Sequence, residues 1–181
     1  MSKEFFTCDG DVYCIEDGKS RKITEKDTEL IDALLGKIRD FYPEADKALR
    51  KAYEKSSLNV PYYKWLMATR FIRCNFGALD TTDADITDDG IFRFEKVKCP
   101  LRGECQLENV VCMPKFNTKL SEAENRVMKL YFENPRIEEI AEVLYLSGHT
   151  VKNHIKAAYA KLGIHSRSEF ISYANKNHLY D

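Results

Sequence analysis

The sequence has no long apolar run. No uninterrupted hydrophobic stretch approaches the roughly 20 residues that a membrane-spanning helix needs. The start of the chain also lacks the apolar core of a signal peptide, because Met1–Phe6 leads directly into polar residues. We therefore expect a soluble cytoplasmic protein with no membrane partner.

The sequence also lacks an excess of charge of one sign. It has 28 Lys and Arg against 29 Asp and Glu, a formal net charge of −1 over 181 residues. A chain without a basic excess cannot coat nucleic acid through bulk charge, so any such contact must come from a local patch. With 44% hydrophobic and 31% charged residues the chain is typical of a globular protein, and its length allows two small domains.

The residues of an enzyme active site are not apparent. No nucleophile, base and orienting residue occur at spacings that indicate one. The chain also shows no phosphate-receiver pattern. We therefore expect that the protein is not an enzyme, and activation by phosphorylation is not supported.

Acidic residues are missing from one stretch near the C-terminus. No Asp or Glu occurs between Glu142 and Glu169, although the chain has 29 of them. The same stretch contains four of the basic residues, Lys152, Lys156, Lys161 and Arg167. Such a run is uncommon by chance and indicates a local basic surface.

Two apolar patterns of helical period meet in this region. The first stripe is Ile137, Ile140, Ala141 and Leu144, and the second is Val151, Ile155, Ala158 and Leu162. The intervening Leu146-Ser147-Gly148 allows only a tight corner, and Ser147 can cap a second helix over residues 147–162. Gly163 then stands where a helix end tolerates positive φ. The pattern predicts a helix-turn-helix.

The second of these helices has a basic face. Lys152, Asn153 and Lys156 lie opposite its apolar stripe. A helix with one packed face and one basic, hydrogen-bonding face suits the major groove of DNA. The alternative is an ordinary solvated face in a pair of antiparallel helices.

Several short motifs here resemble the LuxR/GerE-type DNA-binding domain of bacterial transcription regulators. They occur in that family's order over about residues 119–179. The motifs are Leu120-Ser121-Glu122-Ala123-Glu124, Glu139-Ile140-Ala141, Leu146-Ser147, Thr150-Val151-Lys152-Asn153-His154, Lys161-Leu162-Gly163 and Arg167. Ala123 departs from the family's usual Arg, and Phe170 from its usual small residue.

The resemblance implies a four-helix domain whose third helix reads double-stranded DNA. It places base-facing positions at Lys152, Asn153 and Lys156 and a phosphate contact near Thr150. It also implies a homodimer through the fourth helix, on the outward face between Arg167 and His178, which we expect to be weak. Apart from the resemblance, Ser121-x-x-Glu124 and Ser166-x-x-Glu169 have the pattern of capping boxes, which predicts the starts of two helices.

The N-terminal half is not similar to a family that we can assign. Residues 4–15 predict a β-hairpin around Asp9-Gly10, a strong type I′ turn signal. That register sets Cys8 opposite Asp11 and Cys14 opposite Phe5, which disfavours a disulfide between the two cysteines.

Three helical patterns follow the hairpin. The first begins at Thr24 as a cap, the second covers residues 44–54, and the third runs from Pro61 to Cys74. Bulky residues occur on every side of the third, so we expect a central helix buried against the other two. An aromatic groove for a small ligand is the alternative.

An acidic segment separates these helices from a cysteine-rich region. Tested as a calcium loop from Asp85, it has Gly90 at the sixth position but Lys96 where a bidentate Glu belongs, so we expect an acidic solvated loop. Residues 91–97 are apolar enough to predict a strand.

The six cysteines are concentrated outside the helix-turn-helix. Cys74, Cys99, Cys105 and Cys112 fall within one region, and in a chain without a secretion signal disulfides are the less likely use of cysteines. We expect them to bind a structural zinc, with Cys8 and Cys14 outside the site. An iron–sulfur cluster ranks below zinc because no C-x-x-C pair is present, and four unrelated buried thiols are a further alternative.

The chain is therefore predicted to be mainly α-helical with two domains. An α-rich domain with a small β-hairpin and a cysteine-rich loop region covers residues 1–113, a linker covers 114–118, and the helix-turn-helix domain covers 119–181. The expected function is a sequence-specific transcription regulator of a bacterium or phage. The alternative is an adapter that uses the helix-turn-helix to dock RNA polymerase or a virion or replication protein.

Overall fold

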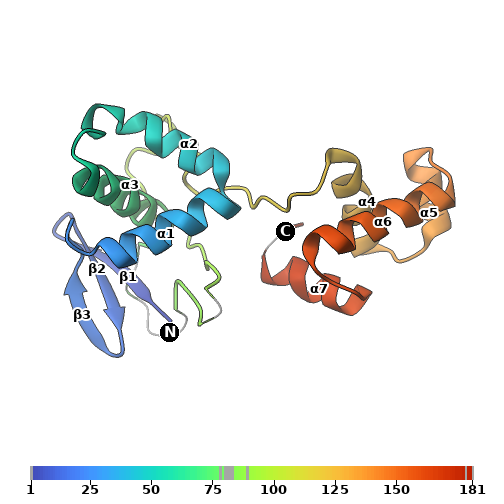
Figure 1. Cartoon of the computed structure of the whole chain (residues 1–181), viewed down its shortest axis with the longest axis horizontal. Coiled ribbons are helices and arrows are strands. Elements are labelled where there is room, and N and C mark those ends of the chain that lie inside the picture. The colour runs from blue at the N-terminus through green and yellow to red at the C-terminus, as the bar shows by residue number, and fades with distance from the viewer. Residues whose placement is uncertain (1, 78, 80–83, 89, 178, 181) are drawn as a thin grey trace. The chain divides into compact units, whose positions relative to one another are not determined.

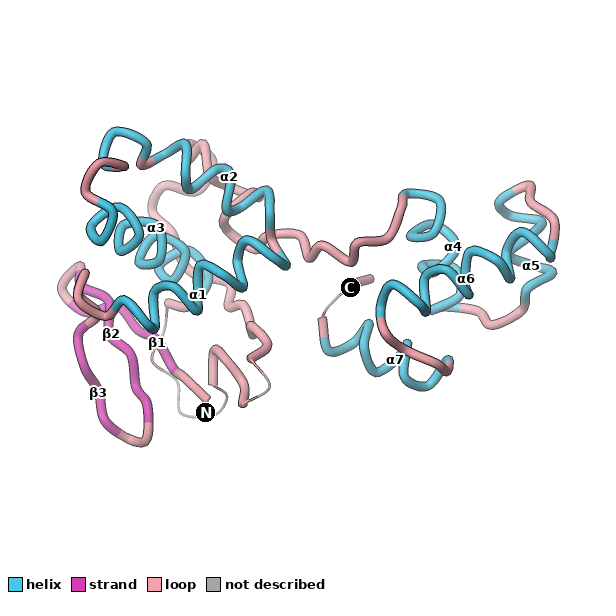
Figure 2. Tube along the Cα trace, viewed as in Figure 1, coloured by secondary structure: helices cyan, strands magenta, loops and turns pink. Residues whose placement is uncertain are grey.

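The computed structural model describes residues 2–77, 79, 84–88, 90–177 and 179–180. The chain divides into two compact units, Met1–Lys115 and Phe116–Asp181. Figure 1 shows the elements of each unit, and Figure 2 shows that helices dominate both, with strands only near the N-terminus. The predicted fold class, mainly helical with a small antiparallel sheet, is confirmed. Among the described residues, no helix is both long and apolar enough to span a membrane.

The sheet of the first unit has three antiparallel strands in the order β1-β2-β3. Strand β1 (Glu4–Cys8) pairs with β2 (Asp11–Glu16) in the predicted register, with Phe5 opposite Cys14. Asp9 and Gly10 both have positive φ, as a type I′ turn requires. Strand β3 (Lys19–Lys22) was not predicted, although Asp17-Gly18 repeats the same turn signal before it.

Three α-helices follow this sheet in the chain. They are α1 (Thr28–Phe41), α2 (Pro43–Ala52) and α3 (Val60–Asn75), with the short 3-10 helix η1 (Glu54–Ser56) before α3. Helix α1 begins later than predicted, because Thr24 is not its cap: the Asp27 carboxylate instead accepts the Thr24 N–H at 2.7 Å. Helix α3 buries Met67, Phe71 and Ile72 and contacts both other helices, as expected of a central helix.

The predicted strand over residues 91–97 is wrong. In the structure this segment is irregular and forms only an isolated bridge between Phe92 and Ile86. Its alternating apolar pattern arises from ring packing, since the Phe92 and Phe94 rings lie 5.7 and 5.9 Å from the ring of Phe71. The alternation of apolar and polar residues therefore reflects burial of the rings in an aromatic core. The segment does not join a sheet.

The acidic segment before it is only partly solvated. Asp85 is buried, and its carboxylate accepts the backbone N–H of Phe5 at 2.6 Å, so the expectation of a solvated loop fails at this residue. Asp88 is exposed. Asp80, Asp83 and Asp89 lie outside the described residues.

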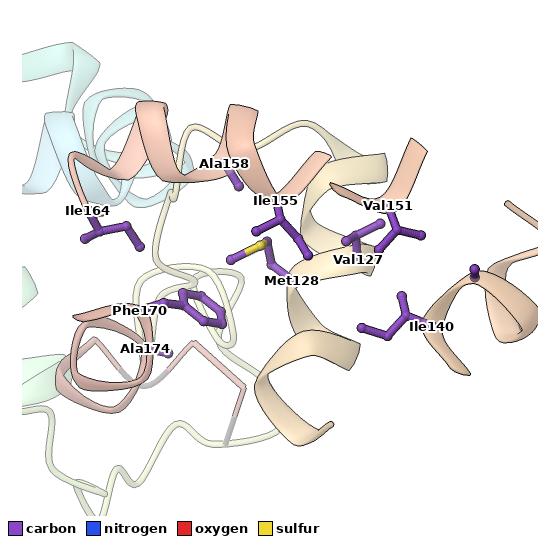
Figure 3. Close-up of a cluster of buried hydrophobic side chains, with 10 residues drawn as sticks. Val127, Met128, Ile140, Val151, Ile155, Ala158, Ile164, Phe170 and Ala174 are labelled. Atoms are coloured by element: carbon purple, nitrogen blue, oxygen red, sulfur yellow. The ribbon is translucent and has the colours of Figure 1, made fainter. Parts of the chain in front are cut away.

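Four helices form the second unit. They are α4 (Glu122–Glu133), α5 (Ile137–Leu144), α6 (Gly148–Leu162) and α7 (Arg167–Lys176). Figure 3 shows their apolar side chains converging on one core. Phe170, the departure from the family pattern, is fully buried there, and its ring lies 6.2 Å from that of Tyr131. The bulky residue is therefore accommodated by aromatic packing.

Helix caps define the starts of these helices. Ser121 and Glu124 form a complete capping box, in which Glu124 accepts the Ser121 N–H at 2.7 Å. Ser166 caps α7, but the Glu169 carboxylate accepts the N–H of His165 instead of that of Ser166. The second predicted box is thus a side-chain cap with a shifted partner.

Candidate nucleic-acid interface and thiol cluster

A tight corner joins α5 to α6. Tyr145 ends α5 with φ of 53°, a left-handed conformation, and its side chain is 96% exposed. Ser147 then caps α6, because its hydroxyl accepts the Thr150 N–H at 3.0 Å. Gly163 ends α6 with φ of 68°, the positive value expected from the sequence.

Helix α6 has one buried and one exposed face. Val151, Ile155 and Ala158 are buried in the core of the second unit. The predicted base-facing residues Lys152, Asn153 and Lys156 are exposed. Among the described residues, neither of these lysines forms an ion pair, so their charges face solvent.

Thr150, the predicted phosphate contact, lies in the first turn of α6. Its hydroxyl is 2.8 Å from that of Ser147, and its side chain is half-buried. No acidic residue occurs in that first turn, so the positive end of the helix dipole is not neutralised by a side chain.

The other two cations of the acid-free stretch are used within the unit. The Lys161 ammonium lies 2.6 Å from the Glu124 carboxylate of α4, and this hydrogen bond lowers the pKa of Glu124. The Arg167 guanidinium donates to the Phe132 carbonyl at 3.3 Å and lies over the Tyr131 ring. The acid-free run therefore overestimates the basic surface. The groups that bind Lys161 and Arg167 lie far away in the sequence, outside this run.

An open groove of about 580 Å³ lies beside α6. Lys152 and Lys156 border it together with Tyr131, Tyr159 and His165. Burial, together with a hydrogen bond to Tyr131, raises the pKa of Tyr159. No sequence motif marks Tyr131, Tyr159 and His165 as one group, because they come from α4, α6 and the turn after α6.

Comparison with known proteins identifies this domain. A family model described as bacterial regulatory proteins, luxR family, matches residues 118–174. The spore germination protein GerE of Bacillus subtilis (strain 168) is 38% identical over 52 residues, which is 29% of this chain and 70% of that protein. The chain belongs to the LuxR family of bacterial regulatory proteins.

The predicted resemblance to the LuxR/GerE type is thus confirmed for the second unit. Membership of the LuxR family assigns this chain, in general terms, to DNA-binding transcription regulators, a class that is not enzymatic. The family model does not extend into residues 1–117. No solved structure matches the chain.

The LuxR-family chain also carries a group of thiols at the end of α3. Burial, followed by the neighbouring Cys112 thiol, raises the pKa of Cys74 to about 12. The next residue, Asn75, is fully buried and holds the backbone on both sides of Cys112. Its amide donates to the Val111 carbonyl at 2.8 Å and accepts the Met113 N–H at 2.8 Å.

A third thiol approaches the same end of α3. The Arg70 guanidinium, one helical turn before Cys74, donates to the Cys105 sulfur at 3.3 Å. Cys99 begins the turn that precedes Cys105 and is half-buried. In the part of the chain that the structure describes, no three thiol sulfurs all lie within 4.8 Å of one another. Cys8 and Cys14 lie apart in the sheet, exposed and buried respectively.

Three carboxylates of the first unit do converge within 4.8 Å, those of Glu4, Asp85 and Glu95. Each accepts a backbone N–H, from Asp85, Phe5 and Gly77 respectively. They therefore fasten separate segments of the unit to one another. No local sequence pattern predicts this cluster, because Glu4 and Asp85 are 81 residues apart.

Proposed function

We propose that the protein is a sequence-specific transcription regulator that reads the major groove of DNA with α6. The observation that carries the proposal is the exposed face of this helix. Lys152, Asn153 and Lys156 are exposed on a helix whose opposite face is fixed in the core, so the face has a defined position in its domain. A rigid helix with such side chains has the shape and donors that base edges require.

The exposed residues have distinct roles in this proposal. Lys152 and Lys156 contact base edges and phosphates, and Asn153 supplies an amide that can pair with adenine. Thr150 contacts a phosphate at the start of α6, where the helix dipole also favours an anion. Lys161 and Arg167 position the helices through Glu124, Tyr131 and Phe132 and do not contribute to the basic face.

We further propose that the protein binds as a weak homodimer strengthened on DNA. A single module buries a small interface, so two half-sites bound together give tighter binding. The mate would be contacted through the outward face of α7, whose exposed positions include Ser168, Ser172 and Asn175. This polar surface is consistent with weak pairing in solution. His178, the end of the predicted face, lies outside the described residues.

Selection of bound fragments from a random DNA pool tests the proposal. A recovered consensus with two inverted half-sites supports both sequence-specific reading and the dimer, and sedimentation with that site should show two chains per duplex. Recovery of a single half-site with one bound chain removes the dimer. No enrichment over the starting pool contradicts the proposed function.

The corner between α5 and α6 favours a second candidate function. Val143 and Tyr145 are exposed apolar side chains, 61% and 96% accessible, which contact with DNA phosphates does not require. They suit contact with a protein such as RNA polymerase, or with a virion or replication protein. If the random pool yields no consensus and Tyr145→Ala abolishes capture of polymerase, docking replaces DNA reading as the function.

A further inference from the structure

The end of α3 holds two cysteines in fixed positions. Cys74 lies within the last turn of the helix, and the buried Asn75 side chain binds the backbone on both sides of Cys112. Residues 36 positions apart are thereby brought into contact. Because Cys74 precedes Asn75 and Cys112 lies between Val111 and Met113, the fold of the unit brings the two cysteines close together.

The other two cysteines lie on a segment that can adjust. Residues 99–112 contain no helix or strand and form successive turns, such as Cys105 N–H to the Leu101 carbonyl at 3.0 Å. Gly103, between Cys99 and Cys105, has φ of 90° and nothing within 4 Å of an added Cβ. Residues 100–104 are exposed. The exposed turns over residues 100–104 can therefore move toward the two fixed thiols, while Val111 stays buried in the core.

Arg70 gives this group of thiols a positive neighbour. Its guanidinium donates to the Cys105 sulfur, while its Nε is buried without a hydrogen-bond partner among the described residues. A partly buried cation is stabilised by a neighbouring anion. Neutral thiols do not supply one, whereas thiolates bound to a metal do.

We propose that Cys74, Cys99, Cys105 and Cys112 bind one structural Zn²⁺ at the end of α3. This inference goes beyond the DNA-binding function and does not depend on it. Zinc at about 2.3 Å from each sulfur would bring the thiolates to about 3.8 Å from one another. Four thiolates and Zn²⁺ carry a formal charge of −2, part of which Arg70 offsets. Four protein ligands leave no open position, so the zinc fastens the turns and does not act on a substrate.

Zinc fits this group better than the other metals considered. Thiolates are soft ligands that select zinc or iron–sulfur clusters over calcium and magnesium. The fixed pair Cys74 and Cys112 comes from remote segments, unlike the closely spaced C-x-x-C ligands of many clusters. The nearby carboxylates Glu4, Asp85 and Glu95 form a separate group bound to backbone N–H groups.

The direct test is the metal content of the full chain, purified without added metal or chelator. We expect about one zinc per chain by mass spectrometry. Replacement by Co²⁺ should give the intense visible absorption of tetrahedral thiolate coordination. Because the spectrum is recorded on the unaltered chain, it does not depend on whether a cysteine variant folds.

Variants then assign the ligands. Cys105→Ser and Cys112→Ser should lose the zinc, while Cys8→Ser, an exposed thiol in the sheet, and Glu95→Gln should keep it. Arg70→Gln should weaken zinc binding by about 10–100-fold, as loss of a group beside metal ligands does elsewhere. If Cys8→Ser binds zinc as tightly as the unaltered chain does, the loss of zinc in Cys105→Ser and Cys112→Ser is specific to those cysteines. It is then not a general response to removing a thiol.

Three results would overturn the proposal. The first is an unaltered chain that contains no metal and binds no Co²⁺. The second is iron with acid-labile sulfide in place of zinc. The third is zinc that persists in Cys105→Ser but is lost in Glu95→Gln, which would move the site to the carboxylates. None of these results bears on DNA binding by α6.

Discussion

The two units of this chain are stabilised by different kinds of contact. In the second unit, apolar stripes of neighbouring helices meet in one core, and Ser121, Ser147 and Ser166 cap the helices. In the first unit, aromatic rings from remote segments and buried polar groups such as Asn75 hold irregular backbone in place. The helical spacing of apolar residues therefore predicts the core of the second unit. The core of the first unit depends on contacts between residues that are distant in sequence.

The same contrast separates the two sites. On α6 the residues that face away from the core are the candidate DNA contacts. The same helical period therefore predicts both the buried face and the DNA-binding face. At the end of α3, Asn75 joins the backbone beside Cys112 to the helix that carries Cys74, across 36 residues of sequence. Substitutions that act on one unit at a time test this difference. Trp65, the only tryptophan of the chain, reports on the first unit by fluorescence, while circular dichroism follows the helices of both.

The largest effect is expected from Phe170→Ala. This ring is fully buried among α4, α6 and α7, and its removal should lower the free energy of unfolding of the second unit by about 3–5 kcal/mol. In a urea titration, the helical signal should show an earlier transition while the Trp65 fluorescence transition stays in place. Tyr145→Ala, at a 96% exposed site, is the control and should change neither. A matching shift in Trp65 fluorescence would show that the units do not unfold separately.

Asn75→Ala should have the next largest effect, and on the other unit. It leaves the buried Val111 carbonyl and Met113 N–H without their partner, which costs about 2–4 kcal/mol together. Here the Trp65 transition should move to lower urea. Gln106→Ala, at an exposed position of the same segment, serves as the control. An unchanged Trp65 transition in Asn75→Ala would contradict the role given to this side chain.

A smaller effect is expected from removing a helix cap. Ser121→Ala loses the hydroxyl that accepts the Glu124 N–H at the start of α4, which should cost the second unit about 0.5–2 kcal/mol. Ser172→Ala, an exposed serine within α7, should leave stability unchanged or slightly higher. Equal effects of the two substitutions on the helical urea transition would show that the cap is not stabilising.

The smallest effect concerns the Glu124–Lys161 pair and depends on pH. The Lys161 ammonium and the Ser121 N–H lower the pKa of Glu124, so its contribution is complete above the ordinary carboxyl pKa. That contribution is lost as the pH falls through the lowered pKa of the folded state. Glu124→Gln should therefore destabilise the second unit by up to about 1 kcal/mol at neutral pH and by less in acid. A destabilisation by Glu124→Gln that grows as the pH falls would contradict the stabilising role of the ionised Glu124 carboxylate.

The sequence predicts most reliably what is local or periodic. The hairpin register that pairs Phe5 with Cys14, the Ser147 cap and the positive φ of Gly163 all follow from neighbouring residues. β3 could have been predicted too, since Asp17-Gly18 carries the signal that identified the first turn. The family motifs added the identity of the second unit.

Contacts between distant residues could not be predicted in this way. Phe92 alternates with polar neighbours as in a strand, yet its ring enters an aromatic core. Lys161 appeared to belong to a basic surface until its partner Glu124, 37 residues away, was known. Asp85 appeared solvated for the same reason, because its partner Phe5 is 80 residues away. Such pairings depend on the tertiary fold and leave no short pattern in the chain.

The central claim is that the exposed face of α6 reads DNA, and one affinity measurement tests it most directly. Binding of the full chain to its selected DNA should weaken by about 1–3 kcal/mol in Lys152→Ala and in Lys156→Ala. Where a phosphate contact is lost, the dependence of log affinity on log salt should also become shallower by about one. Lys129→Ala, which removes an exposed lysine of α4, should bind like the unaltered chain. If both α6 variants bind the selected DNA as tightly as Lys129→Ala does, α6 is not the reading helix.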